Sequence, residues 1–267
     1  MSRASQQPAP APPADVLYPS TDGEPMGEST WHIWALVHLL EGLRDHFAGR
    51  DDVLVAGDLF LYYKEGSPKH SKAPDCMVVF GVGNHHRPSF KTWEEGAVPA
   101  VVIEITSEDT YKEDLHRKGK VYADIGVEEF YLFDPQQVRL DRPLLGFQLG
   151  EEHGFPDYIQ REAEPDGGLD SSALGLRLVP EGTTLRLINL QTGQPLLTGL
   201  EKNLALQEEA RRLDEERQRR EEEQRLRVEE QRLRQEEQRR AEELAAEVDR
   251  LRALLNQRDA ETESAGD

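Results

Sequence analysis

The chain has 267 residues, of which 37% are hydrophobic, a low share that fits one folded domain together with a solvated segment. Its formal net charge of −20 counts against a nucleic-acid binder, because polyanions are bound mainly through Lys and Arg contacts to phosphates. The one cysteine, Cys76, excludes an intramolecular disulfide and favours a reducing compartment, so we expect a cytoplasmic protein. No apolar run approaches the roughly 20 residues of a membrane-spanning helix, and we expect no association with a membrane.

The first part of the chain predicts a helix followed by strands. Residues 1–17 are rich in Pro, Ala, Ser and Gln and are predicted to be disordered, because they can bury little apolar surface. Apolar residues then recur three and four positions apart, which indicates a helix over 28–47. Strands are predicted at 53–56, 59–63 and 76–80, with the first two forming a hairpin around Gly57 and Asp58, and residues 64–73 forming a loop.

The middle of the chain predicts the rest of an α/β domain. After a connecting segment at 81–99, the most apolar run, 101–106, is expected to be a central strand. A helix is predicted at 111–123, ending at Gly126, and another strand at 129–133. This order predicts a mixed sheet flanked by helices. Short runs at 146–149, 174–179 and 185–190, separated by Gly and Pro, predict a β extension of the same domain.

Residues 200–258 predict a long helix, because they are filled with good helix formers and contain no Pro or Gly. Part of this segment carries apolar residues at alternating spacings of three and four, namely Ala241, Leu244, Val248, Leu251 and Leu255. Such a heptad seam favours a coiled coil, through which the chain would form a homo-oligomer. The alternative is a single charged helix held by Glu–Arg pairs. Residues 259–267 are predicted to be a disordered tail.

Two acidic residues stand at the edges of apolar strands. Asp75 precedes the strand 76–80, and Glu104 lies within the run 101–105. An ionised carboxylate beside a dry core is costly unless it is paired or bound to a metal. Two such acids on neighbouring strands can hold a divalent cation, because hard cations prefer oxygen ligands. Alternatively, Asp75 caps a turn at the start of its strand, and Glu104 points outward from an edge strand.

Several short motifs occur together in a characteristic order. They are Pro74-Asp75, the run Ile103 to Ser107, Lys118 four residues before Tyr122, and residues 126–135. Together they resemble the Uma-two family of restriction endonucleases, within the PD-(D/E)xK nuclease superfamily, in a subgroup with a charged helical tail. The resemblance covers residues 18–199. It implies a restriction-endonuclease-like core and metal-dependent endonuclease activity on nucleic acid, with DNA as the expected substrate.

The resemblance also implies roles for particular residues. Asp75 and Glu104 would bind Mg²⁺ or Mn²⁺, with the carbonyl of Ile105 as a further oxygen and Glu28 as a further acid. Glu28 could instead cap the first helix. The superfamily's plainest pattern has a lysine two residues after the Glu, where this chain has Thr106. The implied lysine is therefore Lys118 on the following helix, and it is expected to orient the attacking water or to stabilise developing charge.

Some alternatives remain open at this stage. Lys120 competes with Lys118 for the role of active-site lysine, and Lys118 could simply be an exposed helix residue. The domain could also be a binding or assembly protein that keeps the nuclease fold with weak catalysis and acts through its coiled-coil tail. A third possibility is a scaffold in which the tail is the main functional element.

Overall fold

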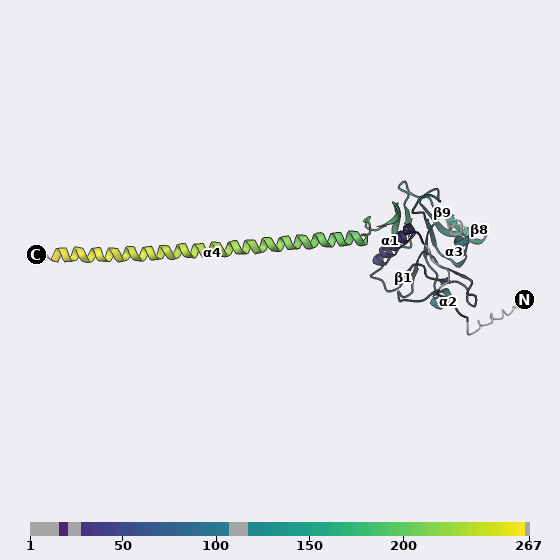
Figure 1. The fold of residues 1–267 in the computed structure, drawn as a ribbon, viewed down its shortest axis with the longest axis horizontal. Helices are drawn as coiled ribbons and strands as arrows, with labels where there is room; N and C mark the ends of the chain where they lie inside the picture. Colours follow the sequence, from purple (N-terminus) through teal and green to yellow (C-terminus); the bar gives the residue numbers. More distant parts are fainter. Residues whose placement is uncertain (1–15, 21–27, 107–116, 265–267) are drawn as a thin grey trace, which may run out of the picture. The chain divides into compact units, whose positions relative to one another are not determined.

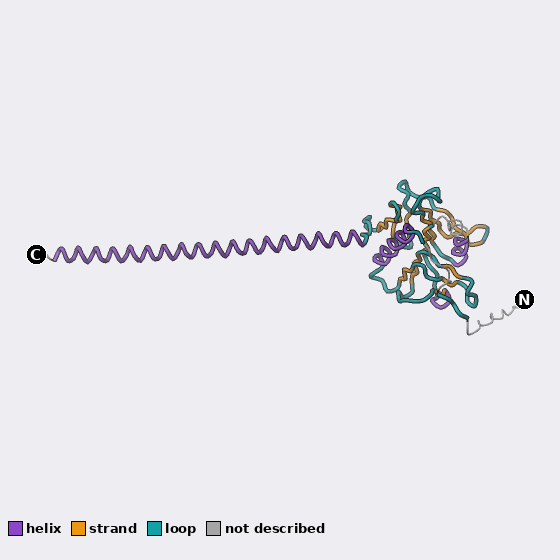
Figure 2. The backbone as a smooth tube through the Cα atoms, in the orientation of Figure 1, coloured by secondary structure: helices purple, strands orange, loops and turns teal. Residues whose placement is uncertain are grey.

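The structure, a computed structural model, describes residues 16–20, 28–106 and 117–264. The chain divides after Leu200 into two units. Within the described ranges, the strands belong to the first unit, and the second unit consists of one long helix (Figures 1 and 2). The predicted mixed α/β domain followed by a helical segment is therefore confirmed. No helix in these ranges is both long and apolar enough to span a membrane.

The helices are α1 (Thr30–His46), α2 (Thr92–Glu95), α3 (Gly119–Ile125) and α4 (Gly199–Ser264). The strands of the main sheet are β1 (Val53–Ala56), β4 (Cys76–Phe80), β6 (Val101–Ile105), β7 (Glu129–Phe133), β8 (Leu144–Glu152) and β9 (Phe155–Gln160). The remaining strands are β2 (Leu61–Tyr62), β3 (Ser71–Lys72), β5 (Phe90–Lys91), β10 (Leu169–Ser171), β11 (Leu176–Glu181) and β12 (Thr184–Asn189).

The main sheet has six strands in the order β1-β4-β6-β7-β8-β9. All neighbouring pairs are antiparallel except β6 and β7, which are parallel. A parallel pair needs a crossover connection, and α3 lies within the segment that joins these two strands. Strand β6 thus lies between β4 and β7, as expected for a central strand. The connection from β6 to β7 keeps α3 close to β6.

The predicted hairpin between residues 53–56 and 59–63 is wrong. Strand β1 pairs with β4, in the register Val53 to Phe80, while β2 joins β3 and β5 in a separate three-stranded sheet. The side chains of β1 are buried on both faces, so its neighbour must be an equally apolar strand. Strand β4 meets that requirement over the length of β1, whereas β2 has only two residues.

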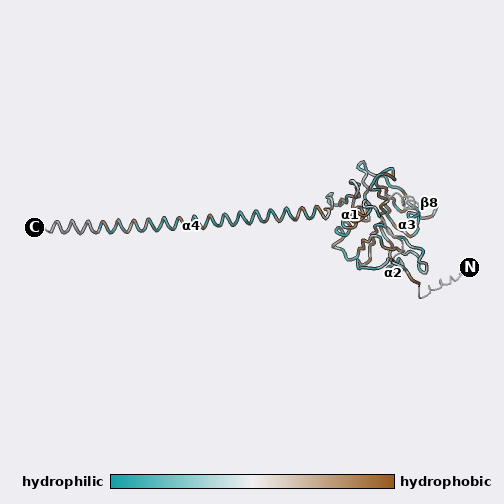
Figure 3. Tube along the Cα trace, in the orientation of Figure 1, coloured by the Kyte–Doolittle hydropathy of each residue, from teal (hydrophilic) through white to brown (hydrophobic). Residues whose placement is uncertain are grey.

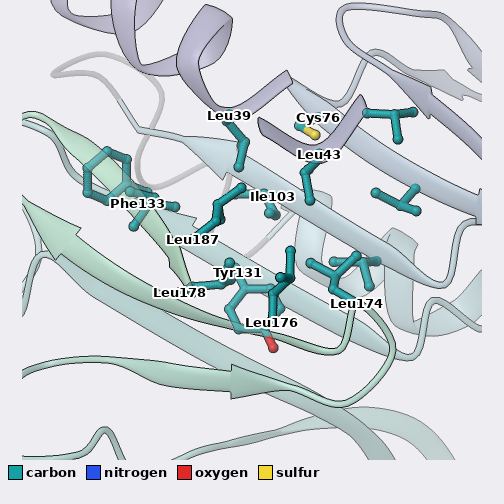
Figure 4. Packing of buried hydrophobic residues seen from close by; sticks show 14 of the residues in the cluster. Leu39, Leu43, Cys76, Ile103, Tyr131, Phe133, Leu174, Leu176, Leu178 and Leu187 are labelled. Atoms are coloured by element: carbon teal, nitrogen blue, oxygen red, sulfur yellow. The ribbon is translucent and has the colours of Figure 1, made fainter. Parts of the chain in front are cut away.

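Helix α1 covers one face of the main sheet. Leu39 and Leu43 of this helix point at the sheet, where Cys76, Ile103 and Tyr131 lie (Figure 4). The helix begins where Ser29 caps it, since the Ser29 hydroxyl accepts a hydrogen bond from the backbone N–H of His32 at 3.2 Å. The predicted start and end of this helix at 28 and 47 are each within two residues of the observed ones.

The opposite face of the main sheet packs against α3 and against the three-stranded sheet β3-β2-β5. Its cluster includes Met77, Val102, Tyr122 and Phe90, which come from β4, β6, α3 and β5. Because side chains alternate between the faces of a strand, Glu104 shares this face with Val102. Helix α3 ends at Gly126, as predicted, where φ is +90°. Residues 111–116 of the predicted helix lie outside the described residues.

The β extension is held to the main sheet by a second buried carboxylate. Strands β10, β11 and β12 form an antiparallel sheet whose leucines join the α1 cluster. Glu129 of β7 is 2% exposed and accepts hydrogen bonds from Tyr131, Ser171 and the backbone of Ala173. Ser171 belongs to β10, so this carboxylate links the two sheets. The extension was predicted in outline, but β9 and β10 were not.

Helix α4 has 66 residues, about 100 Å at 1.5 Å per residue. It extends to Ser264, beyond the predicted end at Arg258, because no Pro or Gly interrupts it before Gly266. Figure 3 shows mainly hydrophilic residues along its middle. Arg–Glu pairs one turn apart line it, for example Arg220 with Glu216 at 2.6 Å. Its apolar residues, including Leu244 and Leu251, are exposed, and the coiled coil stays a prediction.

We predict that Glu129→Gln lowers the free energy of unfolding by about 1–3 kcal/mol, because an amide nitrogen cannot accept the hydrogen bonds that converge on this carboxylate. The matched control is Glu128→Gln, whose side chain is exposed and which should change stability by less than about 0.5 kcal/mol. Urea unfolding followed by tryptophan fluorescence measures this unit alone, because Trp31, Trp34 and Trp93 all belong to it. Equal losses in the two variants would refute the anchoring role of Glu129.

Candidate active site

The pairing of β4 with β6 brings the two predicted acids together. Cys76 pairs with Ile103, and the next step of this antiparallel register sets Asp75 opposite Glu104. The backbone N–H of Ile105 donates a hydrogen bond of 2.6 Å to Oδ2 of Asp75. Asp75 is 9% exposed and Glu104 is 0% exposed. Both carboxylates therefore lie at the carboxyl end of β6, largely shielded from water.

Glu104 is held by two side chains from the region of α3. Lys118 Nζ lies 2.9 Å from Oε2 of Glu104, and the Tyr122 hydroxyl donates a hydrogen bond of 2.5 Å to Oε1. Lys118 immediately precedes the first residue of α3, and Tyr122 follows one turn later. A lysine that comes from this helix thus reaches the carboxylate even though Thr106 occupies the usual strand position.

The structure distinguishes the two competing lysines. Lys120 Nζ lies 3.0 Å from Oδ1 of Asp124 and donates a hydrogen bond to the carbonyl of Pro156, so it points away from Glu104. Its side chain is 51% exposed, whereas that of Lys118 is 18% exposed. The geometry favours Lys118 as the lysine of the site. Tyr122 is buried and also contacts the site.

His32 joins the site without having been predicted. Its Nε2 lies 3.4 Å from Oδ1 of Asp75, and its Nδ1 lies 3.5 Å from Oε2 of Glu28. Burial by itself would lower the pKa of His32, but the contact with Asp75 and the charges of Asp75, Glu28 and Asp58 outweigh it and raise the pKa. The signal that could have revealed it is a histidine one turn after Glu28, on the buried face of α1.

Glu28 and Asp58 lie at the periphery of this group. Glu28 stands just before the cap of α1 and approaches the site through His32. The main chain of Asp58 is tied to β4, because its N–H donates a hydrogen bond of 3.0 Å to the carbonyl of Pro74. The Asp58 carboxyl is exposed, yet partial desolvation raises its pKa, and the negative charge of Asp75 adds to the rise. Asp58, taken above as a turn residue, is therefore close enough to the site for the charge of Asp75 to affect its pKa.

The donor set suits a hard cation in its chemistry. Asp75 and Glu104 supply carboxylate oxygens, and Mg²⁺ commonly uses one or two carboxylates while keeping several waters. Among the described residues, no group of three or more His, Cys, Asp and Glu side chains is arranged to hold a metal ion. The predicted set needs only two such side chains, with the Ile105 carbonyl as a third oxygen. Thr106 Oγ1 nearby is buried and has no hydrogen-bond partner in the described structure.

Other buried carboxylates provide a contrast. Glu129 is satisfied by two hydroxyls and one backbone N–H, and Asp134 accepts backbone N–H groups from Gln136 and from residues 138–140. Neither has a lysine or a second carboxylate among these partners. Asp75 and Glu104 differ from these carboxylates because they lie opposite each other, with Lys118 beside Glu104 and His32 beside Asp75. This concentration of charge marks the site as the candidate for chemistry.

Comparison with known protein families supports the resemblance seen in the sequence. The curated proteins contain no match to this chain. Among solved structures, it is similar to a crystal structure of a putative nuclease belonging to DUF820 from Anabaena variabilis ATCC 29413, with 16% sequence identity and a TM-score of 0.41, covering 58% of this chain and 81% of that one. Residues 14–178, more than half of the chain, match the Uma2 family, described as putative restriction endonuclease. The chain therefore belongs to the Uma2 family of restriction-endonuclease-like proteins.

Proposed function

We propose that this protein is a metal-dependent endonuclease that hydrolyses phosphodiester bonds in DNA. The observation that carries the proposal is the meeting of Asp75 and Glu104 across β4 and β6, with Lys118 at 2.9 Å from Glu104. Membership of a family of restriction endonucleases supports a nuclease in general terms. The cytoplasm is the proposed location, on the ground that the lone cysteine favours a reducing compartment.

Asp75 and Glu104 would hold Mg²⁺ or Mn²⁺, with the carbonyl of Ile105 as a further ligand. A bound divalent ion supplies two kinds of help in such a site, a lower pKa for an attacking water and stabilisation of charge on the phosphate. Glu28 is assigned an outer role, because it approaches Asp75 only through His32.

The chain's own residues prepare this site. The N–H of Ile105 and the ring of His32 fix the two oxygens of Asp75, so the carboxylate has one orientation. The hydroxyl of Tyr122 does the same for Oε1 of Glu104. Lys118 places a positive charge at the remaining oxygen, where it can stabilise the pentacoordinate phosphate formed by in-line attack of water. The proposed roles thus follow from the contacts that each group makes.

We predict that Asp75→Ala, Glu104→Ala and Lys118→Met each reduce cleavage by at least about a hundredfold, because under the proposal each removes a group that acts at the reacting phosphate. Lys120→Met should keep activity within about threefold, because Lys120 is engaged by Asp124 and Pro156. The assay is nicking of plasmid and cleavage of single-stranded DNA by purified protein with Mg²⁺ or Mn²⁺.

Tryptophan fluorescence in urea shows whether each variant is folded. A folded wild-type protein that cleaves nothing with either metal would overturn the proposal, and equal cleavage by all variants would show that the site lies elsewhere. Calorimetric titration with Mn²⁺ adds a readout that is independent of activity, since Asp75→Ala should abolish the binding that the wild type shows.

The second candidate function is a nuclease-fold binding or assembly protein with weak catalysis, which acts through its tail. The observation that favours it is the length of α4, whose apolar side chains at Leu244, Val248 and Leu251 are exposed in the single chain. Exposed leucines in a heptad seam are stabilised when a second helix covers them. Under either function, we propose that the chain self-associates through this seam.

We predict that the full-length protein sediments as an oligomer and that Leu244→Glu combined with Leu251→Glu returns it to a monomer, because the substitutions place charges inside the seam. The matched control is Ala246→Glu with Ala253→Glu, which adds the same charge on the outer side of the helix and should leave the oligomer intact. Sedimentation equilibrium measures the mass. A wild-type monomer at all concentrations would rule out the coiled coil and leave the single charged helix.

A further inference from the structure

A cleft of about 530 Å³ runs along the outer edge of the main sheet. Strand β1 is the edge strand, and all four of its residues line the cleft. The other walls are the last turn of α1 with the residues that follow it, including Arg44 and Arg50, and the segment 84–87. The site described above does not include any of these lining residues.

The charge of the cleft differs from that of the whole chain. Its lining contains three arginines and two histidines, and none of its described lining residues is acidic. Two of the arginines have acidic partners outside the lining, Arg50 with Asp52 at 2.7 Å and Arg87 with Glu95 at 3.1 Å. The whole chain has a formal net charge of −20. The remaining lining is mainly apolar, including Phe47, Val53 and Leu59. Basic groups in an apolar-walled cleft attract anions more strongly than the same groups on an open surface, because low-dielectric walls focus the field.

Arg87 is a buried, fixed part of the cleft wall. Its side chain is only 6% exposed, and its NH1 lies 3.1 Å from Oε1 of Glu95. Its NH2 donates a hydrogen bond to the carbonyl of Gly83, which closes the segment 84–87 into a local turn. Its Nε is buried and has no hydrogen-bond partner in the described structure. A buried guanidinium N–H without an acceptor is costly.

An extended peptide does not fit this edge as well as a phosphate does. A peptide that added a strand to β1 would need its exposed carbonyls as acceptors. Arg44 already donates from Nε to the carbonyl of Val55 at 3.4 Å. Arg44 is also one of the residues that line the cleft. Arginine forks match phosphate oxygens well, so the charge and the donors favour an anionic backbone.

One end of the cleft lies beside the backbone of Asp75. Gly57 lines the cleft, and a Cβ placed on it would lie 2.9 Å from the carbonyl oxygen of Asp75. Four residues of β1 span about 13 Å, which matches about four nucleotides at the 3.4 Å rise of one DNA strand. A strand that leaves the site past Gly57 would therefore pass Arg44 and Arg50 within a few nucleotides.

We propose that this cleft binds the phosphates of the nucleic-acid strand that continues from the scissile bond at Asp75 and Glu104. The inference rests on the proposed nuclease function and deepens it, because it assigns the residues that hold the substrate outside the reacting centre. It also accounts for nucleic-acid binding by a strongly acidic chain, since the basic groups are gathered where the strand passes.

The test is binding of fluorescent single-stranded and duplex DNA of about 20 nucleotides to the full chain in EDTA, followed by anisotropy. EDTA prevents cleavage, so the readout does not depend on activity. Arg44→Gln and Arg50→Gln should each weaken binding about fivefold to tenfold and lower the slope of log K against log salt by about one. Arg44→Lys should restore most of the affinity, because it restores the charge.

The matched control is Arg142→Gln, which removes an exposed arginine that does not line the cleft and should leave binding unchanged. Cleft variants that bind like the wild type, or that lose no more affinity than Arg142→Gln, would overturn the inference, as would a wild type that binds no DNA. Loss of binding in the cleft variants, with no cleavage by the wild type under any metal, would keep the cleft and overturn the nuclease function alone.

Discussion

The burial of the Glu104 carboxylate in the middle of the main sheet is the constraint on which the functional region depends. A carboxylate that is 0% exposed in a central strand must be given partners by the fold, because its hydration is lost. Lys118 and Tyr122 supply them from the start of α3. Helix α3 in turn is positioned by the crossover between the parallel strands β6 and β7. The need of the Glu104 carboxylate for hydrogen-bond partners thus links the order of the strands to the position of α3.

The same constraint explains how a lysine outside the usual strand position can serve the site. The strand residue two positions after Glu104 is Thr106, which is buried but carries no charge. A charge next to Glu104 is still needed, and the helix that follows provides it at 2.9 Å. The proposed chemistry requires an ammonium group near the carboxylate pair, and either a strand or a helix can supply it. The spacing of residues along the chain is therefore a weaker guide than the point in space at which the side chains meet.

Charge is distributed very unevenly in this protein. Acidic groups surround the candidate site, where Glu28, Asp58 and Asp75 all act on His32, while the cleft along β1 is lined by basic groups alone among its charged residues. This arrangement would reconcile a net charge of −20 with the proposed polyanionic substrate. The carboxylates would be neutralised by a divalent cation, and the basic cleft would hold the neighbouring phosphates. Net charge describes the whole surface, whereas recognition depends on the field within one cleft.

The sequence by itself determined the long elements and the positions of Asp75 and Glu104 at strand edges. Strong apolar runs and the spacing of α1 carry that information locally, and family motifs singled out Lys118. The sequence did not reveal the pairing of β1 with β4, the contact of His32 with Asp75, or the cleft that Arg44 and the segment 84–87 both line. Two-residue strands such as β2 show no periodicity, and strand partners far apart in the chain are chosen by burial on both faces of the sheet. Only the tertiary structure could decide these contacts, because each depends on where separate elements pack in space.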